Sequence, residues 1–190
     1  MEHKGLNRTI LAIAVPAFAA LISEPLMLAA DTAIVGRLGP TELAALGASS
    51  TVLTSLIGLC VFLAYSSTAA VSRLQGAGSK SEAMSSAVGA LWLAAGLGLA
   101  LALVVFLGAR PIALIFSSSM LVHRAAVDYL QIASWSIPAA LIVMAATGVL
   151  RGVLDLRTPL FVMIAANLMN IILTLALVFG LDLGLAGAAV

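Results

Sequence analysis

Charged side chains are scarce in this chain, since only 9% of its 190 residues are Asp, Glu, Lys or Arg. A soluble domain carries about 25% charged residues, so this chain lacks the polar surface that a globule needs in water. Nine Lys and Arg stand against eight Asp and Glu, and a net charge of +1 provides no basic surface for nucleic acid. The composition therefore excludes a soluble enzyme, a disordered chain and a nucleic-acid-binding protein.

Cysteine and the motifs of covalent chemistry are also nearly absent. Cys60 is the only cysteine, so the chain forms no internal disulfide. The sequence contains no phosphate-binding loop, nucleophile elbow, haem motif or metal-ligand cluster. We therefore predict no catalytic residue, no metal site and no cofactor, and we expect that the protein is not an enzyme.

Long hydrophobic runs are what the sequence has in abundance. Hydrophobic residues make up 63% of the chain, with a mean hydropathy of +1.20. One bilayer crossing takes roughly 20 apolar residues, and continuous runs favour helices over alternating barrel strands. We predict an all-α polytopic membrane protein with a connector over 111–128 that is amphipathic or re-entrant. The five predicted spans are about 10–35, 46–71, 87–107, 129–150 and 160–181, and a sixth opens after Gly184.

The basic residues of the short loops predict the orientation of the chain. With a cytoplasmic N-terminus, six Lys and Arg lie inside and three lie outside, which favours an N-inside, multi-pass protein of the cell inner (plasma) membrane. The inner residues are Lys4, Arg8, Arg73, Lys80, Arg151 and Arg157, and the outer ones are Arg37, Arg110 and Arg124.

Two carboxylates lie inside the first predicted span. Glu24 and Asp31 are seven residues apart, which places them on one helix face about 10 Å apart along its axis. A carboxylate at membrane depth costs at least ~2.5–3.5 kcal/mol, so intramembrane acids are functional by default. This face either lines a polar cavity or, in the alternative interpretation, is solvated at the membrane interface.

Two prolines interrupt the same helix. Pro16 and Pro25 each remove a backbone donor and leave a carbonyl one turn earlier without its partner. A kinked helix that carries acids suits a moving element, whereas a static bend tolerated by neighbouring helices is the alternative.

The fifth predicted span carries an uncharged polar face. Asn167, Asn170 and Thr174 share one side of the helix because they are spaced by one or two turns. Buried amides and hydroxyls hold membrane helices together, or they supply oxygens to a cation or to a carboxyl proton. In the second case Asp31 is the expected partner.

Several motifs resemble one transporter family. The segment from Glu24 to Gly39, with Asp31-Thr32-Ala33-Ile34-Val35-Gly36-Arg37 at its centre, is similar to the first helix of the multidrug and toxic compound extrusion (MATE) family. The similarity is greatest to the branch of that family named for DNA-damage-inducible protein F. Three further matches follow in the same order along the chain, namely Phe62-Leu63-Ala64-Tyr65 with Gln75-Gly76-Ala77-Gly78, Leu150-Arg151-Gly152 with Arg157-Thr158-Pro159, and Asn167 to Asn170 with Gly187-Ala188-Ala189.

The resemblance implies a cation-coupled exporter of twelve helices in two six-helix lobes. This chain is then an incomplete N-terminal lobe, 1–190, and the C-terminal lobe is absent from it. In such a family the position of Asp31 couples transport to protons or Na⁺, the position of Pro16 bends, and Glu24, Tyr129 and Asn170 are polar partners. Many members carry a second carboxylate where this chain has Thr174, and its absence here favours protons over Na⁺.

We therefore expect an antiporter that exports organic, cationic or amphipathic compounds in exchange for a coupling cation. The alternatives are a flippase for lipid-linked precursors of the same superfamily and a non-transporting membrane subunit. The flippase is disfavoured because a pyrophosphate group needs a basic cavity, whereas the spans of this chain hold acids.

Overall fold

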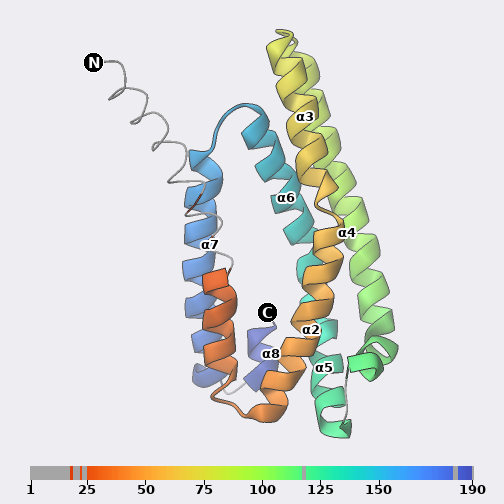
Figure 1. Cartoon of the computed structure of the whole chain (residues 1–190), viewed down its shortest axis with the longest axis vertical. Coiled ribbons are helices and arrows are strands. Elements are labelled where there is room, and N and C mark those ends of the chain that lie inside the picture. The colour runs from red at the N-terminus through yellow and green to blue at the C-terminus, as the bar shows by residue number, and fades with distance from the viewer. Residues whose placement is uncertain (1–17, 19–21, 23–24, 117–118, 182–183, 190) are drawn as a thin grey trace, which may run out of the picture.

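In a computed structural model the chain folds as a bundle of helices, and the structure describes residues 18, 22, 25–116, 119–181 and 184–189. Four helical segments have the length and hydropathy to cross a membrane, namely Pro40–Gly76, Lys80–Phe116, Met120–Gly152 and Arg157–Gly180, and a shorter apolar helix covers Pro25–Val35. The described residues thus form the all-α fold that the hydrophobic runs predict. The labelled helices in Figure 1 are α2 (Pro40–Leu59), α3 (Phe62–Gly76), α4 (Lys80–Phe116), α5 (Met120–Ala133), α6 (Ile137–Gly152), α7 (Arg157–Leu175) and α8 (Gly184–Ala188).

Two of the four long segments are interrupted near their middles. A turn at Cys60 and Val61 separates α2 from α3. A short 3-10 segment, Ser134–Ser136, separates α5 from α6, and the hydroxyls of its first and last residues donate to backbone carbonyls three residues earlier. Hydroxyls that bond back to the chain favour such local departures from the α-helix.

Close backbone contacts join α3, α4 and α6 into one bundle. A Cβ placed on Gly98 of α4 would lie 2.5 Å from Cα of Pro138 in α6. A Cβ on Gly148 of α6 would overlap the backbone of Ala64 in α3. Glycine allows membrane helices to approach this closely. In the same interface the Thr68 hydroxyl of α3 donates a proton that is shared between the Gly148 carbonyl of α6 at 2.9 Å and the Ala64 carbonyl of its own helix at 2.8 Å.

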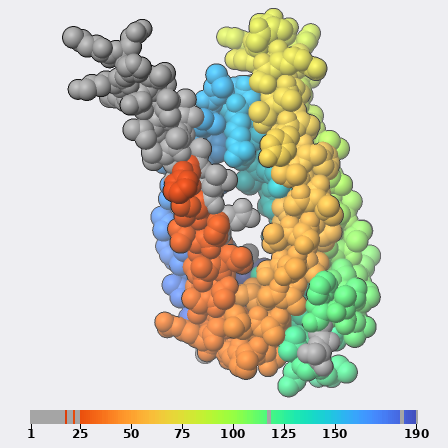
Figure 2. Space-filling view, viewed as in Figure 1, coloured from red at the N-terminus to blue at the C-terminus, as the bar shows by residue number. Residues whose placement is uncertain are grey.

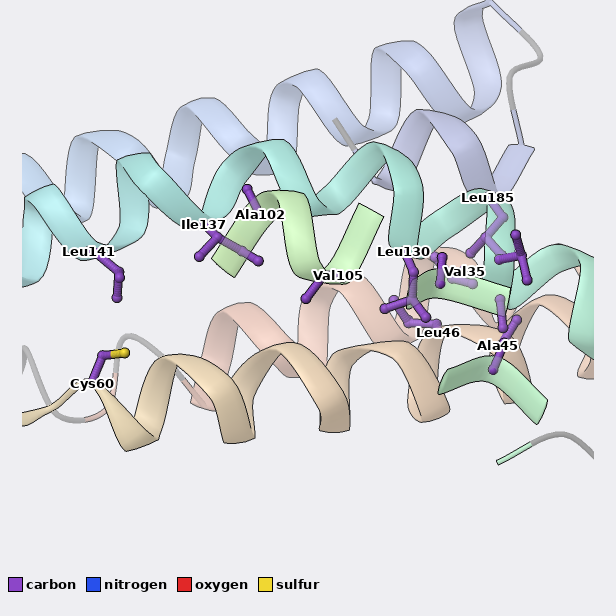
Figure 3. Packing of buried hydrophobic residues seen from close by; sticks show 14 of the residues in the cluster. Val35, Ala45, Leu46, Cys60, Ala102, Val105, Leu130, Ile137, Leu141 and Leu185 are labelled. Carbon is purple, nitrogen blue, oxygen red and sulfur yellow. The ribbon is translucent and has the colours of Figure 1, made fainter. Parts of the chain in front are cut away.

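The buried core extends along this bundle. Figure 3 shows Cys60 and Leu141 at one end of the labelled cluster, and Val35, Leu46 and Leu130 together at the other. Val35 is fully buried and Ile34 almost so. The Pro25–Val35 helix is therefore anchored to the bundle at its C-terminal end.

The Pro25–Val35 helix and α7 lie beside each other as an outer layer (Figure 1). They face one another across a pocket of about 170 Å³ whose lining includes Met27 from the first and Asn167 from the second. Thr174 is the only fully buried side chain of α7. A hollow separates the Pro25–Val35 helix from the α2–α3 segment in Figure 2.

Two differences from the predicted spans have local causes. α4 continues through Pro111 to Phe116, whereas the sequence predicts that the span ends at Arg110 and Pro111. A proline is tolerated inside a membrane helix when neighbouring groups compensate for the lost donor. Consequently the predicted amphipathic or re-entrant connector over 111–128 is replaced by the end of α4 and the beginning of α5, where the Ser119 side chain accepts the Val122 amide.

A π-helical turn, Ala176–Gly180, follows α7 and was not predicted. Its Val178 is buried, and a Cβ on Gly187 of α8 would lie 2.9 Å from the backbone of Leu177. The short helix α8 therefore packs directly on this turn. Such turns within helices are frequent at functional sites.

Two tight turns reverse the chain, one after α3 and one after α6. In each, an amide bonds to the carbonyl five residues earlier, from Ser79 to Leu74 and from Asp155 to Leu150. This hydrogen bond defines a Schellman-type turn, which needs a residue with left-handed backbone conformation just before the amide. Gly78 is that residue after α3, with φ +76°, and Leu154 is that residue after α6, with φ +65°.

Candidate functional site

Asp31 is directed toward the bundle by the anchoring of its own helix. It lies one turn before Val35, and residues four apart in a helix share a face. The fully buried Val35 therefore fixes the face on which Asp31 lies. Asp31 itself is half-buried, and its Oδ1 is an enclosed oxygen without a hydrogen-bond partner. An enclosed and unpartnered carboxylate oxygen is costly.

Tyr129 of α5 is the described polar group that feels the charge of Asp31. The two side chains interact electrostatically, and no described hydrogen bond joins them. Tyr129 packs against the buried core, one residue before the fully buried Leu130. The resemblance implied Tyr129 as a polar partner, and in the structure it comes from the helix that packs on α2 and α4.

Asn170 and Thr174 pair with each other on α7. The Thr174 hydroxyl donates to Oδ1 of Asn170 at 3.3 Å. Thr174 is buried and Asn170 is half-buried. Among the hydrogen bonds of the described residues, none joins this pair to Asp31. The polar face of α7 is thus held by its own bond in this conformation.

The pocket of the outer layer lies close to both Asp31 and the α7 pair. The Pro25–Val35 helix and α7 run in the same direction (Figure 1). Leu26 and Met27 line the pocket from the first helix, and its α7 lining extends from Ile164 to Ile171. Asp31 follows Met27 by one turn, and Asn170 lies within the part of α7 that lines the pocket.

Three of the residues predicted for this site, Pro16, Glu24 and Pro25, lie in the first part of the first predicted span. Glu24 and Pro16 lie outside the described residues. Pro25 is the first residue of the Pro25–Val35 helix. The acidic face of two carboxylates and the bends at the two prolines remain predictions.

Sequence reasoning missed the two helix interruptions that flank this site. The 3-10 segment Ser134–Ser136 follows Tyr129 closely, and the π-helical turn begins two residues after Thr174. Pro138 was a signal for the first, because a proline disfavours a regular helix just before it. No residue type in 176–180 signals the second.

The family model described as MatE matches residues 16–176. The chain is 34% identical over 198 residues to "Protein DETOXIFICATION 44, chloroplastic" of Arabidopsis thaliana, a match that covers 97% of this chain and 38% of that protein. It is 33% identical over 181 residues to "DNA damage-inducible protein F" of Escherichia coli (strain K12), with 93% of this chain and 39% of that protein covered.

The fold is similar to solved transporter structures. One is the "Outward-facing conformation of a multidrug resistance MATE family transporter of the MOP superfamily", with a TM-score of 0.86 and 25% identity. The match covers 95% of this chain and 40% of that one. The chain thus spans about two fifths of the length of the relatives that it matches. These matches confirm the family resemblance read from the sequence.

Proposed function

The chain belongs to the MatE family, and we propose that it forms the N-terminal lobe of a cation-coupled antiporter that exports organic compounds. The observation that carries the proposal is the half-buried Asp31, whose enclosed Oδ1 has no hydrogen-bond partner and which interacts with Tyr129. A charged group in that position is unfavourable unless a cation joins it. A coupling cation is the ligand that its chemistry requires.

Cation binding would change how the outer layer sits against the bundle. When Asp31 is charged, its helix carries an anion toward α5; when it is neutralised, the same face is uncharged and packs on apolar neighbours at lower cost. Such a change drives transport only if the two conformations bind the cation with different affinity. The outer layer is the suitable moving part because Thr174 is the only fully buried residue of α7.

The oxygen ligands that the described residues offer favour the proton as the coupling ion. Na⁺ is a hard cation that prefers several oxygen ligands, anionic ones above all. Near Asp31 the chain offers the hydroxyl of Tyr129, and α7 offers the neutral oxygens of Asn170 and Thr174 instead of a second carboxylate. A site with few anionic ligands is better suited to a proton, which Glu24 on the same predicted face would share with Asp31.

The exported compounds are proposed to be organic cations or amphipathic molecules. The acidic first helix favours positive charge, and the apolar lining of the pocket beside it, with Leu26, Met27 and Ile164, favours hydrophobic groups. Because alternating access needs two halves that rock against each other, the chain would work with a second lobe. We also propose the inner membrane and a cytoplasmic N-terminus, on the strength of the loop charges.

Substrate-driven proton movement in vesicles tests this function. The full-length transporter that carries this lobe is reconstituted with a pH-sensitive dye inside, and a cationic dye serves as the transported probe. In wild type, protons should cross the membrane in the direction opposite to the probe, and Asp31→Asn should abolish this coupling while the protein still inserts. Asp128→Asn, which removes an exposed carboxylate from α5, is the matched control and should retain coupling.

Two results would count against the proposal. Coupled efflux that persists in Asp31→Asn would remove Asp31 from the mechanism. Transport driven equally well by a Na⁺ gradient at fixed pH would leave the antiporter in place and overturn the proton as its coupling ion.

A further inference from the structure

Two turns of the chain share one hydrogen-bond pattern but differ in their side chains. The Schellman-type bond closes Ala77-Gly78-Ser79 after α3 and Val153-Leu154-Asp155 after α6. The first turn holds only small residues. In the second, Val153 is 41% exposed and Leu154 is 87% exposed, which is the largest exposed fraction among the large hydrophobic side chains of the described residues. The same backbone motif thus presents an apolar surface at one turn and no large side chain at the other.

Leucine is an unfavourable residue for such a turn in water. The left-handed conformation of Leu154, with φ +65°, strains a residue that carries a Cβ, whereas Gly78 adopts the equivalent conformation freely. The exposed side chain also keeps apolar area in contact with water, where its burial would stabilise the protein. An apolar neighbour would remove the second penalty. The turn after α6 is therefore expected to lie against hydrocarbon or against another apolar surface.

The ends of α3 and α6 lie side by side. A Cβ placed on Gly152 of α6 would lie 2.9 Å from the Cβ of Val71 in α3. Both turns lie at the same end of the molecule, and the α3–α4 turn projects further (Figure 1). Arg151 directly precedes Gly152, and Arg73 follows Val71 by two residues. The two arginines therefore lie at a similar level on neighbouring helices.

The length of the next segment places the α6–α7 turn near the membrane surface. Arg157–Gly180 has 24 residues, which correspond to about 36 Å of helix, whereas the hydrocarbon core of a bilayer is about 30 Å thick. Arg157 therefore lies close to the hydrocarbon edge when the segment spans the bilayer, and Leu154 lies in the adjoining interface. Ala77 lies six residues beyond Val71, which is about 9 Å further out along α3. The α3–α4 turn thus reaches toward the water.

The charged side chains near the α6–α7 turn are cationic and exposed. Arg73, Arg151 and Arg157 are all exposed. Asp155 is the acid of this turn, and its oxygens already accept two amides and one hydroxyl from the first turn of α7. Within the described part of the chain, no acid forms an ion pair with Arg73 or Arg151. A guanidinium group binds phosphate oxygens through two parallel hydrogen bonds, so these side chains suit a phosphate group.

We propose that the α6–α7 turn anchors the protein to anionic lipids, with Leu154 among the outer acyl-chain segments and the neighbouring arginines on headgroup phosphates. Arg151 and Arg157 reach the phosphates from the turn itself, and Arg73 reaches them from α3. Charge complementarity and depth carry this assignment, because cations and an apolar tip occur together where anionic headgroups meet hydrocarbon. The inference adds a lipid-binding surface to the protein, and it holds whichever ion drives transport.

Spin labels at the two turns test the depth of Leu154. Leu154→Cys and, as the matched control, Ala77→Cys are each labelled in a full-length transporter from which the other cysteines, Cys60 included, have been removed. The protein is reconstituted in vesicles that contain phosphatidylglycerol. Oxygen dissolves in hydrocarbon and a nickel chelate stays in water, so the collision rates of the label with each report its depth. We expect the label at position 154 to collide more with oxygen and the label at position 77 to collide more with the chelate.

Two results of the labelling experiment would overturn the inference. A label at position 154 that collides mainly with the nickel chelate would place the turn in water. A label that neither oxygen nor the chelate reaches would place protein over the turn, and the second lobe of the transporter would then be its occupant. Cooperative thermal unfolding of each labelled protein shows that the label reports on a folded molecule.

Lipid titration tests the arginines. The full-length transporter in detergent is titrated with phosphatidylglycerol, phosphatidylcholine or inorganic phosphate, and the rise in unfolding temperature gives an apparent affinity, because a ligand of the folded state stabilises it. We expect only phosphatidylglycerol to raise the unfolding temperature. Arg151→Gln and Arg157→Gln should each weaken its apparent affinity about fivefold. Arg110→Gln, which changes an exposed arginine at the other end of α4, should leave that affinity unchanged.

The titration also separates a lipid site from a simple anion site. An equal rise with inorganic phosphate would overturn the lipid as the partner, and an equal rise with phosphatidylcholine would overturn the need for an anionic headgroup. Equal losses of affinity in Arg110→Gln, Arg151→Gln and Arg157→Gln would overturn the assignment to the α6–α7 turn.

Discussion

The α3–α4–α6 bundle and the outer layer formed by the Pro25–Val35 helix and α7 are held in different ways. In the bundle, Gly98 and Gly148 bring backbones into direct contact, and Thr68 ties two helices together. In the outer layer, Thr174 is the only buried residue of α7, and a pocket separates α7 from the Pro25–Val35 helix. The comparison shows one region held by backbone contacts along its length and another that is buried at only a few positions, Ile34, Val35 and Thr174. The predicted coupling residues Asp31 and Asn170 belong to the second.

The largest expected effect comes from filling the glycine contacts of the bundle. Gly98→Ala places a methyl group 2.5 Å from the Pro138 backbone, and Gly148→Ala overlaps the Ala64 backbone. Because backbone cannot move aside cheaply, each should lower stability by about 1–3 kcal/mol or more. Gly96→Ala is the control on the exposed side of α4, since nothing lies within 4 Å of its added methyl. Thermal unfolding in detergent, followed by Trp fluorescence, measures the difference; equal losses at 96 and 98 would contradict the packing described.

A pair of threonines should show the same contrast with a smaller effect. Thr68→Val removes the 2.9 Å bond from α3 to the Gly148 carbonyl of α6, and the usual cost of such a bond is about 1 kcal/mol. Thr174→Val removes a bond to Asn170 within α7 and breaks no link between helices. We expect a clear fall in the unfolding temperature for the first and a smaller one for the second. The reverse order would mean that the outer layer is the more firmly held region.

The two Schellman-type turns give a sharper test at the border between the regions. The turn inside the bundle has Gly78 in the left-handed position, whereas the turn that leads out to α7 has Leu154 there. A side chain in that conformation costs roughly 1–2 kcal/mol. Leu154→Gly should therefore raise stability by about 1 kcal/mol, and Gly78→Ala should lower it by about as much. Chemical denaturation in mild detergent compares them, and a loss on Leu154→Gly would show that the leucine is held there by contacts instead.

The smallest effect concerns the beginning of α7. The Asp155 carboxylate accepts the Thr158 hydroxyl at 2.6 Å and the amides of Arg157 and Thr158 at 3.1 and 3.0 Å. The hydrogen bonds with Thr158 lower the pKa of Asp155 from 3.8, and Arg157 adds a weaker charge effect. The folded state therefore gains stability from the charged form at pH above that value and loses it as the pH falls through the lowered pKa.

Asp155→Asn consequently has a pH-dependent outcome. The variant should unfold at a slightly lower temperature than wild type at pH 7, and the gap should close as the pH falls below the folded pKa of Asp155. The effect is small because the group is fully exposed. Unfolding curves of both proteins at several pH values check this, and a gap that widened in acid would have the wrong sign.

The sequence predicted the features of this molecule that depend on composition and on the spacing of residues along a helix. Hydrophobic runs identified the spans because apolar length is what a bilayer requires. The cost of a buried charge singled out Asp31, and four-residue spacing placed Asn170 and Thr174 on one face, where they share a hydrogen bond. Tyr129 came from the family resemblance alone, because a tyrosine within a helix has no distinctive local pattern.

The features that the sequence did not reveal depend on contacts between distant segments. α4 passes through Pro111 without ending, which a local rule for proline does not anticipate. The interruption at Ser134–Ser136 and the π-helical turn at Ala176–Gly180 are departures of a few residues inside apolar runs. The glycine contacts could not be predicted either. Gly96 and Gly98 lie in similar sequence, but a Cβ on Gly96 would contact nothing, whereas a Cβ on Gly98 would meet the Pro138 backbone.

The central claim is that the outer layer moves against the bundle under the control of Asp31, and spin-label distances test it most directly. Labels at Leu28→Cys and Leu103→Cys report the outer layer against α4, and labels at Leu103→Cys and Val143→Cys report α4 against α6, all at exposed positions and in a Cys60→Ala background. We expect the first distance to shift with pH in the full-length protein, the second to stay constant, and Asp31→Asn to abolish the shift. A first distance that does not respond to pH, or that responds equally in Asp31→Asn, would contradict the account.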